Sequence, residues 1–257
     1  MVHGFVGSSL YFSNLAKVLA AAGRRVICID LYGRGGSAFD PAVRPSCKYF
    51  AGQLAHLLMH LGFGPACPVD LVGYSMGGGV VAEFTAMFPN CVRKLSLLAP
   101  VGASSMTTTV PPRIQAVVRA FPPAGFFLGR MVTKRLANAS AYGKQWRTKE
   151  TSDIFKELHP KEVIRSKEEH ALPLAAVASL AHLNWSDMGS TYQKIAASGV
   201  PTQLVWGIQD TTVPYAGAAE LQAWLPNVEL TTLPDDGHCF PIEFPKETAE
   251  MLQKFWA

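Results

Sequence analysis

Between residues 24 and 100, short apolar runs alternate with longer amphipathic segments, and this alternation restricts the chain to a small set of folds. The apolar runs have strand length and cover residues 25–30, 69–73 and 94–99. The segments between them carry apolar residues at helical spacing and cover residues 50–61 and 76–88. Near-continuous apolar strands separated by helices are typical of parallel sheets. We therefore predict an α/β protein with a mostly parallel sheet flanked by helices.

The alternation extends toward both ends of the chain but is interrupted in the middle. A helix is predicted before the first strand and four elements after residue 199: a helix at 10–22, strands at 203–207 and 228–233, and helices at 215–225 and 245–256. From 101 to 198 the strands disappear while helical periodicity remains, which indicates a helical insertion. We expect a core formed by 1–100 and 199–257 and a helical cap formed by 101–198.

Composition excludes several classes of function. The net charge of +4 contains no long run of Lys and Arg, so no nucleic-acid partner is expected. The five cysteines include no CxxC pair, which argues against a disulfide framework and a zinc site. We expect neither a metal nor an organic cofactor. No apolar stretch has the roughly 20 residues of a membrane-spanning helix, and the chain starts without a signal-peptide pattern. A reducing, cytoplasmic compartment is expected.

The segment Gly73-Tyr74-Ser75-Met76-Gly77 fits the pattern G-x-S-x-G and lies between a predicted strand and a predicted helix. In that setting the glycines leave room for a sharp turn. The turn holds the Ser75 hydroxyl above the sheet, at a helix N-terminus that favours developing negative charge. Ser75 is the candidate nucleophile.

A serine hydroxyl needs a base, and the base needs a third group that fixes its tautomer. His238 and Asp210 each follow a predicted strand, so both lie at the carboxyl edge of a parallel sheet, where α/β proteins place their sites. The order Ser, Asp, His along the chain is the one that accompanies a G-x-S-x-G turn between a strand and a helix. Asp235 and Asp236 are alternative acids, which we interpret as solvated turn residues.

The tetrahedral intermediate needs N–H donors for its oxyanion. Met76, directly after the nucleophile, supplies one candidate donor. The loop His3-Gly4-Phe5-Val6-Gly7 precedes the first helix and supplies the second through Phe5. We predict an oxyanion hole formed by the N–H groups of Phe5 and Met76.

These motifs together resemble the α/β-hydrolase superfamily, in the branch of small esterases, monoglyceride-lipase-like enzymes and meta-cleavage-product hydrolases. The resemblance covers nearly the whole chain. Its motifs are the loop at His3, the turn at 30–37, the elbow at Ser75, the segment Gly207-Ile208-Gln209-Asp210, and Gly237-His238. The resemblance implies an α/β-hydrolase fold and hydrolase activity. The resemblance also implies that Asp30 and Arg34 hold the turn at 30–37 in place and do not take part in catalysis.

The nucleophile separates the members of this branch. Epoxide hydrolases and haloalkane dehalogenases carry Asp at the elbow, whereas this chain carries Ser75. Meta-cleavage hydrolases commonly have Trp after the histidine, whereas Cys239 stands here. We expect a serine hydrolase that cleaves a small or lipid carboxylic ester through an acyl-enzyme. Hydrolysis of a carbon–carbon bond in a meta-cleavage-type diketone and an inactive ligand-binding homologue are the alternatives.

The predicted cap differs in charge from the rest of the chain. Residues 101–198 contain thirteen Lys or Arg and seven Asp or Glu, a net charge of +6, whereas the remainder has a net charge of −2. The cap also contains an apolar run with Phe121, Phe126 and Phe127. Such a cap suits an acyl substrate or transient contact with an anionic membrane surface; anchoring of the cap on the core is the alternative. The predicted substrate-binding residues are His3, Gly4, Tyr74, Phe121, Phe126 and Phe127.

In the family the loop at His3 follows a complete central strand, but only Met1 and Val2 precede it here. A strand of about five residues does not fit in that length. We therefore expect the N-terminal strands of the fold to be missing.

Overall fold

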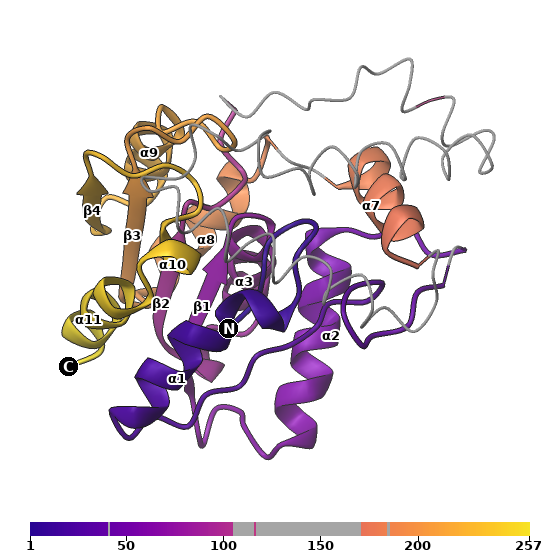
Figure 1. Ribbon diagram of the computed structural model, residues 1–257, viewed down its shortest axis with the longest axis horizontal. Helices are drawn as coiled ribbons and strands as arrows, with labels where there is room; N and C mark the ends of the chain where they lie inside the picture. Colours follow the sequence, from indigo (N-terminus) through magenta and orange to yellow (C-terminus); the bar gives the residue numbers. More distant parts are fainter. Residues whose placement is uncertain (41, 105–115, 117–170, 184–185) are drawn as a thin grey trace.

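The computed structural model describes residues 1–40, 42–104, 116, 171–183 and 186–257 (Figure 1). Within them a four-stranded sheet has the order β1-β2-β3-β4, with every neighbouring pair parallel. The strands are β1 Val69–Tyr74, β2 Val92–Leu98, β3 Thr202–Gly207 and β4 Glu229–Leu233. They agree with four of the predicted strands to within two residues. The α/β fold and the parallel sheet are confirmed.

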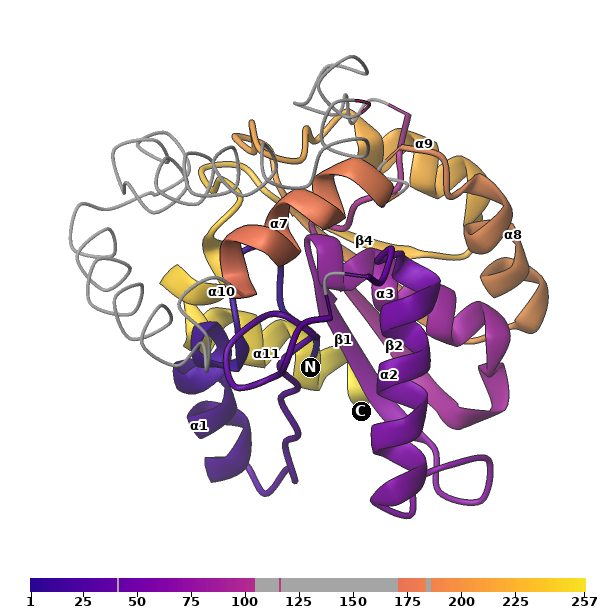
Figure 2. The same ribbon diagram turned by 90° about the vertical axis from the view of Figure 1, so that its right-hand side faces the viewer.

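Helices cover both faces of the sheet (Figures 1 and 2). On one face α1 contacts both α10 and α11; their bounds are α1 Ser13–Ala21, α10 Phe240–Glu243 and α11 Pro245–Trp256. On the other face α3 contacts α2 and α8, and α8 contacts α9; their bounds are α2 Cys47–His60, α3 Met76–Met87, α8 Gly189–Ser198 and α9 Gly217–Trp224. The helix α8 lies within the range that we assigned to the cap, yet it packs on the core helices.

The segment 25–30 does not form the predicted strand. In the described residues its pairing is one parallel bridge between Ile29 and Val2, and a ladder needs consecutive partners. Val2 also bridges Gly73 in β1, so this residue links the two segments. Its N–H donates to Val72 O at 2.9 Å, and its carbonyl accepts from Tyr74 N at 3.0 Å. These bonds fix the start of the loop at His3 beside the end of β1.

The first predicted helix is divided into a short 3-10 helix, Ser9–Phe12, and α1. The Ser8 hydroxyl caps the 3-10 helix by accepting from Leu10 N at 3.2 Å. A second described helix of the predicted cap range is α7, Ala171–His182. Figure 2 shows α7 lying across the end of the sheet where the strands finish.

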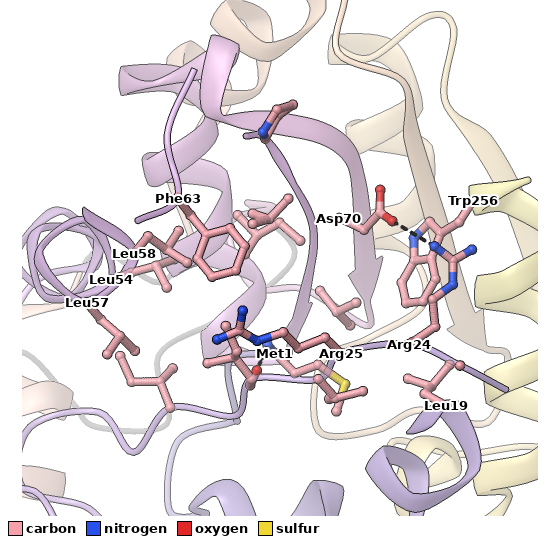
Figure 3. Close-up of a pocket in the computed structure, with 18 residues that line it drawn as sticks. Met1, Leu19, Arg24, Arg25, Leu54, Leu57, Leu58, Phe63, Asp70 and Trp256 are labelled. Atoms are coloured by element: carbon pink, nitrogen blue, oxygen red, sulfur yellow. Dashed lines mark hydrogen bonds and ion pairs between the residues drawn. The ribbon is translucent and has the colours of Figure 1, made fainter. Parts of the chain in front are cut away.

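A cavity of about 260 Å³ lies at the opposite end of the sheet (Figure 3). Its lining includes the start of β1 with Asp70, together with Arg24, Phe63 and Trp256. Arg24 and Arg93 both pair with the Asp70 carboxylate at this end of β1. Because Ser75 follows the last residue of β1, this cavity is remote from the candidate chemistry.

In the described residues no helix is both long and apolar enough to cross a membrane.

Candidate active site

Ser75 occupies a sharp turn between β1 and α3. Its backbone has φ 56° and ψ −121°, a left-handed conformation that non-glycine residues rarely adopt. Three hydrogen bonds fix the turn. The Ser75 N–H donates to Leu98 O at 2.9 Å, and the Ser75 carbonyl accepts from Gly78 N at 2.9 Å and Val101 N at 3.2 Å. The structure therefore has the strained strand-to-helix turn that the G-x-S-x-G pattern requires.

Both glycines of the motif are in close contact with backbone. A Cβ atom added to Gly73 would lie 2.4 Å from Gly77 O, and one added to Gly77 would lie 2.2 Å from Val2 O. Ordinary van der Waals contacts of a Cβ atom begin at 3.4 Å. The absence of a side chain at Gly77 lets α3 begin against the segment that leads into the loop at His3.

We expect Gly77→Ala to lower the free energy of unfolding by about 1–3 kcal/mol or more, because backbone atoms must move to admit the methyl group. Gly52→Ala is the matched control, since Gly52 lies inside α2 with open space around it. This control is expected to gain about 0.5–1 kcal/mol from helix propensity. Urea unfolding measures both changes; equal midpoints would contradict the close approach at Gly77.

His238 and Asp210 form a buried pair. The His238 Nδ1 lies 2.7 Å from Asp210 Oδ2, and the side chains are 5% and 0% exposed. The other carboxylate oxygen, Asp210 Oδ1, accepts from the backbone N–H groups of Thr212 and Val213, each at 2.9 Å. A neutral imidazole that donates from Nδ1 carries its lone pair on Nε2. The carboxylate thus orients the ring as a general base requires.

The loops that carry this pair are joined by backbone contacts. Gln209 N donates to Asp236 O at 3.0 Å, and a Cβ added to Gly207 would lie 2.2 Å from the same oxygen. Asp235 is exposed in the turn, as expected. The expectation of solvent exposure is wrong for Asp236, which is 2% exposed because its backbone packs against the end of β3.

Tyr74, predicted to bind substrate, contacts the histidine. Its hydroxyl donates to His238 O at 3.1 Å, and the two ring centroids are 5.0 Å apart. The Tyr74 side chain is buried within the protein. Since Tyr74 precedes Ser75 directly, this residue links the turn at Ser75 to the loop that carries His238.

The loop at His3 reaches Ser75 through Gly4. A Cβ added to Gly4 would lie 3.2 Å from Ser75 Cβ, so the loop backbone passes directly beside the serine. Phe5, the next residue, is partly buried. Met76 begins α3 and is fully buried. The first N–H groups of a helix have no partner within it, which suits Met76 to donate toward a developing oxyanion.

His3 supports this loop from inside the protein. Its side chain is fully buried; Nδ1 lies 2.7 Å from Gly4 O, and Nε2 accepts from Leu31 N at 3.0 Å. The ring therefore orders the backbone, in place of the substrate contact that we predicted. Gly4 O and the Phe5 N–H belong to one peptide plane, so this bond also orients the candidate donor. Burial lowers the pKa of His3 from 6.5 to about 4.

We expect His3 to make the protein sensitive to mild acid. In the unfolded chain His3 takes up a proton below pH 6.5, whereas in the folded chain it stays neutral until about pH 4. Its stabilising contribution is therefore complete above pH 6.5 and is lost as the pH falls toward 4. At about 1.4 kcal/mol per pH unit, the loss between pH 6.5 and 5 is about 2 kcal/mol.

Urea unfolding at pH 7 and pH 5 tests this expectation. His3→Gln is expected to be less stable at pH 7 but to lose less stability on acidification than the wild type. His60→Gln is the control, because His60 is exposed on α2. The same loss at pH 5 in His3→Gln and wild type would contradict the assignment.

Three predicted substrate-binding residues, Phe121, Phe126 and Phe127, lie outside the described residues.

Asp30 makes the hydrogen bonds expected of a residue that holds its turn in place. Its two carboxylate oxygens accept from Ser9 N at 2.7 Å and Gly36 N at 2.9 Å. In the part of the chain that the structure describes, no three His, Cys, Asp or Glu residues gather as metal ligands would.

Curated relatives match the chain over its full length. It is 25% identical over 258 residues to the bovine (Bos taurus) monoacylglycerol lipase ABHD6, covering 100% of this chain and 74% of the relative. It is 26% identical over 266 residues to the Mus musculus sn-1-specific diacylglycerol lipase ABHD11, covering 100% of this chain and 80% of that relative.

Solved structures share the fold. The chain superposes on a thermophilic esterase from Thermogutta terrifontis with a TM-score of 0.72 and 22% identity, covering 99% of this chain and 87% of that one. An esterase from Exiguobacterium antarcticum gives a TM-score of 0.75 and 18% identity, covering 99% and 90%. The family model described as alpha/beta hydrolase fold matches residues 1–245. This chain therefore belongs to the alpha/beta hydrolase fold family.

Proposed function

We propose that this protein is a serine hydrolase that cleaves a carboxylic ester through an acyl-enzyme intermediate. The observation that carries the proposal is the buried His238–Asp210 pair at 2.7 Å, next to a strained turn that displays a serine. Tyr74 contacts His238 and precedes Ser75, so the base and the nucleophile belong to one packed unit. This arrangement supports the roles of nucleophile, base and orienting acid in a Ser-His-Asp triad.

In the first step Ser75 Oγ attacks the ester carbonyl while His238 Nε2 takes the hydroxyl proton. The negative charge that develops on the carbonyl oxygen is stabilised by the N–H groups of Phe5 and Met76. Collapse of the tetrahedral intermediate breaks the bond to the alcohol, which leaves with the proton from His238. Asp210 stabilises the imidazolium that exists between the two transfers.

In the second step water replaces the alcohol. His238 takes a proton from the water as it attacks the acyl-enzyme, and the same two N–H groups stabilise the second oxyanion. The proton then passes to Ser75 Oγ as the acid leaves. None of these steps needs a group other than water and the residues named.

The substrate that we propose is an ester with an apolar acyl chain. The relatives named monoacylglycerol lipase and diacylglycerol lipase support a lipid ester. The net charge of +6 and the phenylalanines in 101–198 suit an acyl chain carried by an anionic or amphipathic molecule. Contact with an anionic membrane surface stays a prediction for this segment; equal sedimentation with neutral and anionic liposomes would contradict it.

A fluorophosphonate probe tests the serine chemistry, because it reacts with an activated serine and not with an ordinary hydroxyl. We expect one adduct per chain, mapped by mass spectrometry to the peptide that contains Ser75. A folded chain, checked by circular dichroism, that takes up no probe would contradict the proposal.

A second measurement separates the substrate classes. Hydrolysis of p-nitrophenyl esters with short, medium and long acyl chains is expected, with higher kcat/KM for the longer chains that still fit. A vinylogous diketone is the comparison substrate for carbon–carbon bond hydrolysis. Faster cleavage of the diketone than of every ester would replace ester hydrolysis by that alternative.

A further inference from the structure

Arg34 is fully buried and donates to three separate segments. Its Nε donates to Phe5 O at 3.1 Å, in the loop at His3. Its Nη1 donates to Tyr32 O at 3.1 Å, in its own turn. Its Nη2 donates to Ser179 Oγ at 2.8 Å, on α7 and 145 residues away. One side chain thus joins the loop of the candidate oxyanion donor to α7, a helix within the predicted cap range.

The helix α7 sits directly on the turn that carries Arg34. A Cβ added to Gly33, which has φ +78°, would lie 2.3 Å from Ala175 Cβ. Ser179 is fully buried one helical turn further along α7. The guanidinium also lies 5.3 Å from the centre of the Phe50 ring on α2. These contacts hold the guanidinium between a core helix and α7.

The bond from Arg34 acts on the residue that carries the candidate donor. The Phe5 carbonyl belongs to the peptide after Phe5, and the Phe5 N–H belongs to the peptide before it. His3 holds the first of these peptides through Gly4 O, and Arg34 holds the second through Phe5 O. With both peptide planes fixed, the dihedral angles of Phe5 and the direction of its N–H are fixed as well. An error of about 1 Å in such a position lowers a rate by about 10²-fold.

We propose that Arg34 is a positioning residue that holds the Phe5 N–H at the oxyanion site and couples that donor to α7 through Ser179. The proposal rests on the proposed function, since it assigns Phe5 to the same reaction. A guanidinium suits this role because its planar group presents N–H donors in several fixed directions. A lysine ammonium is a point charge at the end of a flexible side chain.

Two variants test the two halves of the proposal. Arg34→Met removes all three bonds, and we expect kcat for a p-nitrophenyl ester to fall about 10²-fold while KM changes less than about 3-fold. Ser179→Ala removes only the hydrogen bond to α7. We expect kcat to fall about 3- to 10-fold, because two hydrogen bonds then hold the guanidinium in place of three. Arg25→Met and Ser198→Ala are the matched controls: Arg25 lines the remote cavity and Ser198 ends α8, so both are expected to keep the wild-type kcat.

The fluorophosphonate probe separates this proposal from the proposed function. Labelling of Ser75 in the wild type, with a selective loss of kcat in Arg34→Met or Ser179→Ala, supports the positioning role. A wild-type kcat in a folded Arg34→Met overturns it, as does an increase in KM without a loss of kcat. If Arg34→Met does not fold, Ser179→Ala decides by the same criteria. A folded wild type that neither labels nor hydrolyses esters contradicts the proposed function and, with it, this inference.

Discussion

Replacing Ser75 with alanine is expected to lower kcat/KM for ester hydrolysis by about 10⁶-fold. The change removes the proposed nucleophile but leaves the strained turn, because alanine makes the same backbone hydrogen bonds with Leu98, Gly78 and Val101. The loss should therefore appear in kcat/KM and in probe labelling, while the free energy of unfolding changes by less than about 0.5 kcal/mol.

The matched control for this experiment is Ser190→Ala, at an exposed position on α8. It is expected to hydrolyse esters at the wild-type rate and to keep the probe adduct on Ser75. Initial rates with a p-nitrophenyl ester and urea unfolding give both quantities. A folded Ser75→Ala with more than about one hundredth of the wild-type kcat/KM would show that another nucleophile performs the reaction.

Asp210→Asn is expected to lower kcat by about 10⁴-fold. The reason lies in the two sides of this carboxylate. Asp210 Oδ1 accepts from the N–H groups of Thr212 and Val213, so the oxygen of an asparagine amide is held on that side. The amide NH₂ then faces His238 Nδ1 and donates to it. The imidazole takes the other tautomer, with the proton on Nε2, and can no longer accept the proton of Ser75.

Asp235→Asn is the matched control, since Asp235 is exposed on the loop that carries His238. Its kcat is expected to stay within about 2-fold of the wild type, because the change adds no donor to the histidine. The measurement is kcat at saturating ester, with circular dichroism to check folding. A larger loss of kcat in Asp235→Asn than in Asp210→Asn would contradict the assignment of the orienting role to Asp210.

The sequence predicted the elements whose signal is local. Four strands and the nucleophile turn follow from periodicity and from glycine spacing within a few residues, and the structure has them where expected. The prediction of a strand at 25–30 is wrong for a reason that lies outside these residues. The segment has the composition of a strand, but in the described residues it pairs through one bridge at Ile29, and a ladder requires partners that the segment cannot supply itself.

The candidate triad was also readable from the sequence, since Ser75, Asp210 and His238 each follow a strand and parallel strands end at one edge. The tertiary structure shows why the acid that is more distant in the chain holds the histidine. Asp236 is two residues from His238 in the chain, yet the bond at 2.7 Å comes from Asp210, because β3 and β4 are paired and bring the two loop ends together.

The hydrogen-bond partners of His3, Tyr74 and Arg34 were decided by the tertiary structure alone. The sequence placed His3 and Tyr74 near a substrate, whereas the structure turns both toward protein atoms that are 28 and 164 residues away. The contact between Arg34 and Ser179 spans 145 residues. Local sequence patterns report the propensity and the periodicity of single segments. The direction of a buried polar side chain is set by which distant backbone groups the packing brings within hydrogen-bond distance.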